Sequence, residues 1–169
     1  MKIVHNIPSI NKSFGGPIFS TKIIANEQAK SGNQVFVVTS KGFDKSDEVI
    51  FDEDIKVIKI KGYTKFKFMF NWSKILYDNV GVPDIIHTYG LWTYNNYAAF
   101  NFCTKYNVKH IIAPCGMLCG KAMESSERLK KIALIMFQKK IITHSDAIHV
   151  KSIFLVSDTA HARFDATAR

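Results

Sequence analysis

The stretch PDIIHTYGLWTYNNYAAFNFCTKYNVKHIIA, residues 83–113, contains one complete unit of the expected fold. A short apolar run from Asp84 to Thr88 is typical of a buried strand, and residues from about Tyr94 to Tyr106 fit a helix. A second apolar run, His110 to Ala113, predicts the next strand. Two strands joined by a helix indicate a parallel pair, because a right-handed crossover returns the chain to the same sheet.

The same alternation continues on both sides of this stretch. Further strands are predicted at Ile3 to Ile7, Val35 to Val38, Ile55 to Ile60 and Ala147 to Val150. Further helices are predicted from about Pro17 to Ser31 with Gly32 as the cap, from Lys67 to Val80 before Gly81 and Pro83, and from about Leu129 to Ile141. Lysines alternate with apolar residues in the strand at 55–60, which indicates a place near an edge of the sheet. The expected fold is a doubly wound α/β domain, with a mostly parallel sheet and helices on both faces.

The chain has the length of one domain, and its last residues differ in character from the rest. With 169 residues and 47% hydrophobic side chains, it can fill a single core. Four of the last ten residues are alanine, and two of the three arginines fall in the last seven positions. We expect a domain over residues 1–152, followed by a tail over 153–169 that is truncated or frameshifted, or else an ordinary short terminal helix.

The charge of +9 suggests an anionic partner, which could be a membrane surface, a nucleic acid or a phosphorylated ligand. A soluble lysine-rich surface explains it as well. Nothing except charge favours nucleic acid, so no nucleic-acid partner is expected. The chain begins without a signal peptide and has no apolar run of membrane-spanning length, which predicts a cytoplasmic protein.

The common metal and nucleotide motifs are absent from the sequence. Cys115 and Cys119 lie near His110, but their spacing without a second ligand pair favours buried thiols over zinc. No metal or cofactor is expected. Neither the glycine pattern of dinucleotide-binding domains nor the phosphate-binding loop of nucleotide hydrolases occurs. His5 and His87 fall within predicted central strands, where histidines bonded to their neighbours are expected.

Three loops follow the carboxyl ends of predicted strands, where ligands bind in open parallel sheets. They contain Gly15 and Gly16 after the first strand, Tyr89, Gly90, Leu91 and Trp92 after the fourth, and Cys115, Gly116 and Met117 after the fifth. Gly15 and Gly16 precede a helix that has Pro17 in its first turn, and exposed N–H groups at a helix N-terminus attract phosphate. We expect the three loops to share one site. The two glycines form either a diphosphate cradle or a flexible turn.

One segment interleaves lysines with large apolar rings, a pattern that suits the membrane interface. The residues expected to contact a membrane surface are Lys65, Phe66, Lys67, Phe68, Phe70, Trp72 and Lys74. The same rings could instead face the core, flanked by solvated lysines. Both interpretations stay open at the sequence level.

Four segments together resemble the N-terminal domain of family 4 glycosyltransferases, which have the GT-B fold. They are MKIVHNIPSINKSFGGP at the start, PDIIHTYGLWTYNNYAA, IIAPCGML, and SDAIHVKS at the end of the last helix. The resemblance covers roughly residues 1–152. The order and spacing of the segments make the combination more specific than any single one.

The resemblance implies retaining transfer of a sugar from a nucleotide-sugar donor to a glycan or lipid-linked acceptor, without a required metal. Gly15 and Gly16 match the loop that approaches the donor diphosphate. The loops at 89–92 and 115–117 match the acceptor side of the site. Synthesis of a surface polysaccharide at the inner face of the membrane is the expected setting.

Two departures from the family pattern lower the activity that we expect. Cys115 stands where members with this type of loop usually have a histidine near the donor sugar. The half of the protein that would supply cationic groups for the diphosphate is not in the sequence, and such groups stabilise the departing charge. We expect little activity from this chain alone. The alternative is a non-catalytic remnant or an acceptor- or membrane-binding module.

Overall fold

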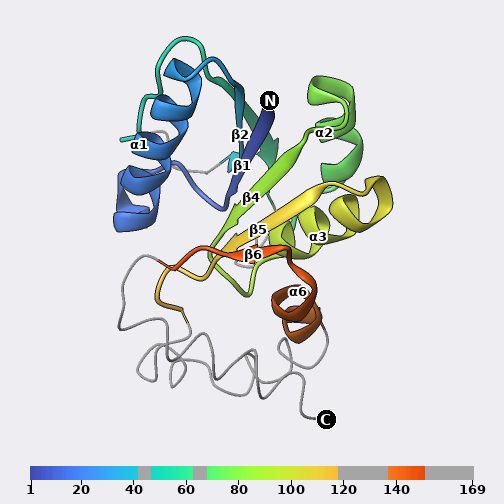
Figure 1. Ribbon diagram of the computed structural model, residues 1–169. Helices are drawn as coiled ribbons and strands as arrows, with labels where there is room; N and C mark the ends of the chain where they lie inside the picture. The colour runs from blue at the N-terminus through green and yellow to red at the C-terminus, as the bar shows by residue number, and fades with distance from the viewer. Residues whose placement is uncertain (42–46, 63–67, 118–136, 151–169) are drawn as a thin grey trace.

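The structure is a computed structural model that describes residues 1–41, 47–62, 68–117 and 137–150. Its six strands form one sheet in the order β3-β2-β1-β4-β5-β6, and every pairing is parallel (Figure 1). The strands are β1 (Lys2–Ile7), β2 (Gln34–Lys41), β3 (Lys56–Lys61), β4 (Ile85–Tyr89), β5 (Lys109–Ala113) and β6 (Ala147–Ile148). The predicted doubly wound α/β fold is confirmed.

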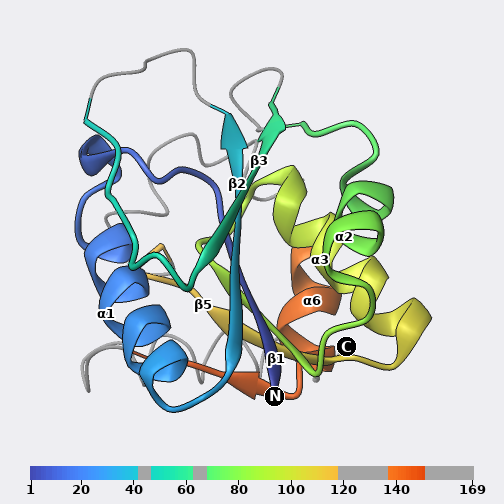
Figure 2. The same ribbon diagram turned by 90° about the horizontal axis from the view of Figure 1, so that it is seen from above.

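Helices cover both faces of the sheet. They are the short η1 (Lys12–Phe14), then α1 (Gly16–Lys30), α2 (Trp72–Val80), α3 (Tyr94–Tyr106) and α6 (Lys139–His144). Figure 2 shows α1 on one face, with α2, α3 and α6 on the other. The chain leaves β1 toward β3 and then returns to place β4 on the other side of β1. The strand order therefore reverses between β1 and β4, which is where α/β sheets bind their ligands.

Each face of the sheet packs against its own hydrophobic cluster. On the α2 and α3 side, the cluster includes Val4, Ile86, Leu76, Trp72 and Phe102. On the α1 side it includes Ile7, Val37, Ile18, Ala25 and Tyr89. Strands that are buried on both faces need apolar residues at nearly every position, which explains the uninterrupted apolar runs in the sequence.

Helix α2 is shorter than predicted, and this corrects one residue of the membrane-surface prediction. The helix begins at Trp72, not Lys67, because Asn71 adopts a left-handed conformation with φ 58°. Met69, just before that turn, is fully buried, and Trp72 is only 1% exposed. Trp72 therefore belongs to the core and cannot lie on a membrane surface. The apolar stripe of Met69, Trp72, Leu76 and Val80 is buried as predicted.

Two further predictions of local structure are confirmed. Strand β3 is at the edge of the sheet, and Lys56, Lys59 and Lys61 on it are exposed. Gly32 follows α1 with φ 82°, which a residue with a side chain rarely adopts. Residues 129–136 of the last predicted helix and the tail at 153–169 lie outside the described residues.

Candidate functional site

Residues that follow β1, β4 and β5 lie close together around Gly90, at the carboxyl edge of the sheet. Its N–H donates to the carbonyl of Ala113 at 2.8 Å, and its carbonyl accepts from Nδ2 of Asn96 at 2.8 Å. A methyl group on Gly90 would lie 3.3 Å from Cε of Met117 and 3.9 Å from Cγ of Pro8. The loop after β4 thus touches both the loop after β1 and the loop after β5.

The Met117 side chain links the loops after β4 and β5 beside Gly90, a contact region that we call the Gly90 junction. Its sulfur accepts a hydrogen bond from the backbone N–H of Leu91 at 3.1 Å, and Leu91 is 1% exposed. On the other side, the Ser40 hydroxyl at the end of β2 donates to the carbonyl of Pro8 at 2.6 Å. Four neighbouring strand ends are therefore connected through a few short contacts.

Gly15 and Gly16 lie at the amino end of α1, on the same carboxyl edge. Gly15 has φ 76° and ψ −149°, a conformation open essentially to glycine alone. Within the part of the chain that the structure describes, no side chain caps α1 and no atom lies within 4 Å of where a methyl group on either glycine would be. The diphosphate-binding role of the two glycines stays a prediction.

The loops after β4 and β5 hold backbone in unusual conformations. Trp92 has φ 64° and Cys115 has φ 54°, and Gly90 and Gly116 also have positive φ. Left-handed residues with side chains are uncommon and cluster at functional sites. The Trp92 N–H donates to Oε1 of Gln138, which ties this loop to the residue just before α6.

A buried network of polar side chains holds the loop after β4 in place. Asn6 on β1 donates to the carbonyl of Asn95 at 3.0 Å and to the hydroxyl of Thr88 at 3.4 Å. The Thr88 hydroxyl also bonds Nε2 of His110 at 3.0 Å. All four side chains are at most 2% exposed. Because buried polar groups are costly unless bonded, this network fixes the start of α3 relative to the sheet.

His5 and His87 are core histidines bonded to neighbours, as predicted. Nδ1 of each ring lies 3.0 Å from the hydroxyl of Tyr89, and Nε2 of His5 lies 2.8 Å from Oε1 of Gln28. Burial lowers the pKa of His5 from 6.5 to about 4, so its ring is neutral at physiological pH. Burial also raises the pKa of Tyr89, which keeps its hydroxyl protonated.

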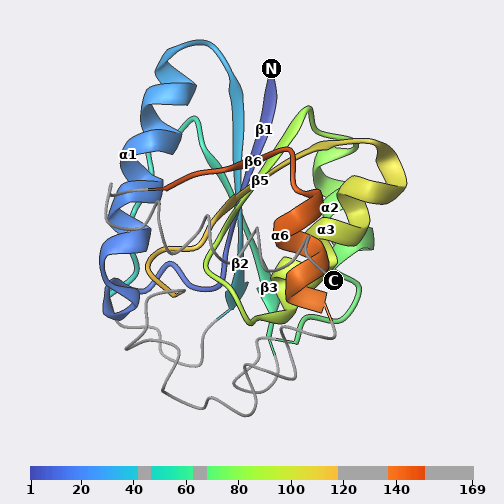
Figure 3. The same ribbon diagram turned by 60° about the horizontal axis from the view of Figure 1, so that its bottom comes forward.

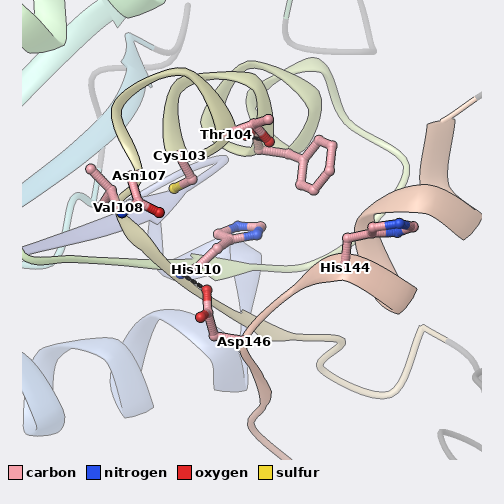
Figure 4. A pocket seen from close by; sticks show the side chains of 8 residues that line it. Cys103, Thr104, Asn107, Val108, His110, His144 and Asp146 are labelled. Carbon is pink, nitrogen blue, oxygen red and sulfur yellow. Dashed lines mark hydrogen bonds between the residues drawn. The ribbon is translucent and has the colours of Figure 1, made fainter.

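A separate pocket of about 240 Å³ opens at the amino edge, away from the predicted loops (Figure 4). Asp146 accepts from the N–H of His110 at 2.9 Å and from Nζ of Lys109 at 2.8 Å, and these bonds lower the pKa of its carboxyl. Burial raises the pKa of the Cys103 thiol to about 12, so this cysteine is unreactive. Through these bonds Asp146 joins the residue before β6 to the start of β5. The groups that line this pocket therefore have a structural role.

The described residues contain no group of three or more histidine, cysteine or acidic side chains arranged to hold a metal ion. Cys103 and Cys115 are thiols and not halves of a disulfide, while Cys119 lies outside the described residues. Within the same ranges, no helix is both long enough and apolar enough to cross a bilayer.

The basic and aromatic segment is only partly described. Lys65, Phe66 and Lys67 lie outside the described residues. Phe70 is 62% exposed, whereas Phe68 packs between Phe70 and Tyr94, with ring centroids 4.8 and 4.3 Å away. Lys74 is exposed and pairs with Asp78 at 2.6 Å.

Comparison with solved structures identifies the fold. Sucrose-phosphate synthase from Thermosynechococcus elongatus superposes with a TM-score of 0.68 over 95% of this chain, at 13% sequence identity. The chain has the fold of a GT-B glycosyltransferase domain. It spans 45% of the synthase and 49% of a second similar structure, a UGT transferase from Siraitia grosvenorii in complex with UDP. That structure has a TM-score of 0.48 over 99% of this chain, at 11% identity.

No protein-family model matches the sequence, and no curated protein matches it either. The likeness to solved structures therefore establishes the fold, and the reaction is a matter for proposal.

Several contacts at the carboxyl edge were not predicted. The sequence does not reveal that the Met117 sulfur accepts from Leu91 or that Asn6 reaches Asn95 across 89 residues. One feature of the site could be inferred from the sequence. His87 and Tyr89 lie two residues apart along a strand, so their side chains must share one face. Which residues of neighbouring strands join them depends on strand order, and a single sequence does not state that order.

Proposed function

We propose that this chain is the acceptor-side domain of a retaining glycosyltransferase that moves a sugar from a nucleotide-sugar to a glycan or lipid-linked acceptor. Its proposed setting is the synthesis of a surface polysaccharide. The observation that supports this most directly is the meeting of three strand-end loops around Gly90, at the point where the strand order reverses. Ligands of open parallel sheets bind at such points.

The proposed roles follow from position. Gly15 and Gly16, without side chains and at an uncapped helix N-terminus, would let the donor diphosphate approach backbone N–H groups. The loops at 89–92 and 115–117 would contact the acceptor. Their backbone is held by buried partners, which suits a site that must keep its geometry when a ligand arrives.

A second domain is expected to supply most of the donor affinity. This chain spans less than half the length of the two similar structures. Helix-end N–H groups alone bind phosphate weakly, and transfer also requires positive charge beside the departing diphosphate. We therefore expect weak nucleotide binding from this chain by itself, and sugar transfer only with a partner domain.

The experiment that tests this proposal is a titration of the ¹⁵N-labelled chain with UDP, GDP and ADP, followed by NMR. We expect at least one nucleotide to shift the amide signals of Gly15 and Gly16. Gly16→Asp should reduce the affinity at least tenfold, because its carboxylate would repel the diphosphate. The same carboxylate should not harm the fold, since negative charge is favourable at a helix N-terminus.

The matched control is Gln34→Glu, which adds the same charge at an exposed position at the amino end of β2. It should leave nucleotide binding unchanged. If neither glycine signal responds to any of the three nucleotides at millimolar concentration, the donor-side role of this loop is wrong. If Gly16→Asp and Gln34→Glu lowered the nucleotide affinity equally, the loss would be due to net charge alone.

The alternative is a module that binds the acceptor without catalysing transfer, and Cys115 is the observation that favours it. This residue replaces the histidine expected beside the donor sugar. Shifts of the signals of Gly90, Trp92 and Gly116 upon addition of an oligosaccharide, with no response of Gly15 and Gly16 to any nucleotide, would support the binding module over the enzyme.

We further propose a peripheral location on an anionic membrane surface, with Phe70 as the exposed ring that enters the headgroup region. Co-sedimentation with vesicles containing phosphatidylglycerol measures this. Phe70→Ser should lower the bound fraction severalfold, because it removes exposed apolar area without disturbing the core. Tyr77→Ser, at a ring that is 49% exposed on α2, is the control. Equal binding by neutral and anionic vesicles would contradict the proposal.

A further inference from the structure

Buried polar atoms without a hydrogen-bond partner gather at the start of α3 and at the residue just before α6. Of the nine such side-chain atoms among the described residues, five lie there. They are Nε1 of Trp92, Oγ1 of Thr93, Oδ1 of Asn95, Oδ1 of Asn96 and Nε2 of Gln138. A buried polar atom without a partner costs free energy, so a cluster of them indicates that another molecule supplies the missing bonds.

Hydrogen bonds hold these residues close to one another. Oε1 of Gln138 accepts from the backbone N–H of Trp92 at 3.1 Å. The N–H of Asn96 donates to the carbonyl of Thr93 at 3.1 Å, and its Nδ2 donates to the carbonyl of Gly90 at 2.8 Å. Helix α6 packs beside α3, as Figure 3 shows, which keeps Gln138 next to the loop after β4. The cluster is therefore continuous with the Gly90 junction.

The cluster reaches from the interior to the surface. Asn96 and Gln138 are fully buried, whereas Trp92 and Thr93 are half-buried. Thr93 is the N-cap of α3, and within the part of the chain that the structure describes its side chain makes no capping bond. Asn95 differs from the other four residues, because its Nδ2 donates to Asn6 on β1. The atoms available to a ligand are therefore those of the other four.

Three aromatic rings lie beside this cluster. Tyr94 and Tyr97 belong to the first turn of α3, and their ring centroids are 6.3 Å apart. Phe137, the residue before Gln138, has its ring centroid 5.9 Å from that of Tyr97. The Tyr97 ring is 43% exposed, and the other two are half-buried. A ligand that contacts the polar atoms therefore also meets an aromatic surface.

The kinds of atom in the cluster indicate the class of ligand. Nε1 of Trp92 and Nε2 of Gln138 can only donate. Oδ1 of Asn96 can only accept, and the Thr93 hydroxyl can do both. The two amides are oriented by their other ends, since Oε1 of Gln138 accepts from an N–H and Nδ2 of Asn96 donates to a carbonyl.

A ligand for this cluster must both donate and accept. An ammonium group only donates, a fully ionised phosphate only accepts, and a lipid chain does neither. Hydroxyl groups do both, so a ligand that carries several neighbouring hydroxyls can satisfy all four atoms. A sugar ring carries such hydroxyls and also has an apolar C–H face.

We propose that Trp92, Thr93, Asn96 and Gln138, together with the ring of Tyr97, form a subsite for one sugar unit of the acceptor. The four polar atoms bond hydroxyls of the sugar, and the ring packs against its C–H face. Small-molecule sites commonly combine aromatic side chains with a few placed polar groups in this way. The inference rests on the proposed function and narrows it, because it assigns a sugar unit and not a lipid chain to the loop after β4.

The first test is a titration of the whole ¹⁵N-labelled chain with the methyl α-D-pyranosides of glucose, mannose and galactose, followed by NMR. These probes cover both orientations of the hydroxyls at carbons 2 and 4. We expect at least one of them to shift the indole N–H signal of Trp92 and the side-chain amide signals of Gln138. Trp72, the other of the two tryptophans, is 1% exposed and is the internal control. If none of the three probes shifts the signals of Trp92 and Gln138, the proposal is wrong.

Two further probes test the chemistry of recognition. Cyclohexanol has a ring of similar size with a single hydroxyl, and inorganic phosphate is an anion without an apolar face. Both should leave the Trp92 signal unchanged at concentrations at which a glycoside shifts it. An equal response to cyclohexanol would mean that the site recognises apolar shape alone, and a response to phosphate alone would mean an anion site. Either result refutes the sugar subsite.

Thr93→Val separates sugar binding from a structural role. It removes a hydroxyl that has no partner among the described residues and keeps the shape of the side chain, so the free chain should be as stable as before. The affinity for the glycoside should fall about three- to tenfold, the usual effect of losing one hydrogen bond. Thr104→Val is the matched control, because that hydroxyl bonds the carbonyl of Phe100 within α3. Unchanged affinity in Thr93→Val, or an equal loss in Thr104→Val, would contradict the proposal.

Tyr97→Ser tests the aromatic part of the subsite and should lower the affinity severalfold. Tyr77→Ser, at a ring that is 49% exposed on α2, should leave it unchanged. Glycoside binding that is equally strong in Tyr97→Ser and in the original chain would show that the ring does not contact the sugar. The nucleotide titration of Gly15 and Gly16 remains the test of the proposed function. If both glycines respond to a nucleotide while Trp92 ignores every glycoside, this inference alone is refuted.

Discussion

At Gly90, the backbone conformation and the missing side chain both serve the site. The residue has φ 79°, bonds Ala113 and Asn96 through its backbone, and leaves room for Met117 and Pro8 beside its Cα. Residues with side chains reach this conformation only at a cost of roughly 1–2 kcal/mol. The junction therefore depends on glycine for two separate reasons.

Gly90→Ala is expected to lower the free energy of unfolding by about 1–3 kcal/mol. The backbone strain supplies most of the loss, because the Met117 side chain can move away from the new methyl group. Urea unfolding followed by circular dichroism measures the change. Gly16→Ala is the control, since a methyl group there meets no atom within 4 Å among the described residues and φ is not positive. Equal stabilities of the two variants would contradict this account.

At the scale of elements, the apolar periodicity predicted the bounds of a helix best where one segment packs against one surface. Helix α3 runs from Tyr94 to Tyr106, as its pattern indicated. Helix α2 was predicted five residues too long, because the apolar spacing continues through Met69 while the backbone turns at Asn71. The spacing of apolar residues indicates which residues are buried. It does not indicate whether a buried residue belongs to the helix or to the turn before it.

The site was predicted as three loops, and the contacts among them depend on strand order. Pro8 after β1 and Met117 after β5 both lie beside Gly90, while the sharing of one site with Gly15 and Gly16 stays a prediction. The partnership of His5 with His87 follows from the pairing of β1 with β4, which place them side by side. His149 could not be assigned to the same group, because it follows β6, the strand at the far edge of the sheet. Long-range pairing of this kind is absent from local sequence patterns.

At the scale of the whole molecule, the sheet buries histidines on both of its faces. His5 lies on the α1 side, and His110 lies on the α3 side, where it bonds Thr88. Burial lowers the pKa of each ring from 6.5 to about 4. Since the unfolded chain takes up these two protons near pH 6.5 and the folded chain only near pH 4, acidification favours unfolding across that interval.

The free energy of unfolding should therefore be largest above about pH 6.5 and should fall as the pH drops from 6.5 toward 4. Each histidine contributes up to about 3 kcal/mol, by the usual conversion of a pKa difference. The Asp146 carboxyl, whose pKa is lowered in the folded chain, adds a loss only at more acidic pH. Urea unfolding at half-unit steps between pH 4 and 8 measures the slope. His110→Gln removes one of the two protons and should halve the slope, while a pH-independent stability across this range would show that neither ring is held neutral by the fold.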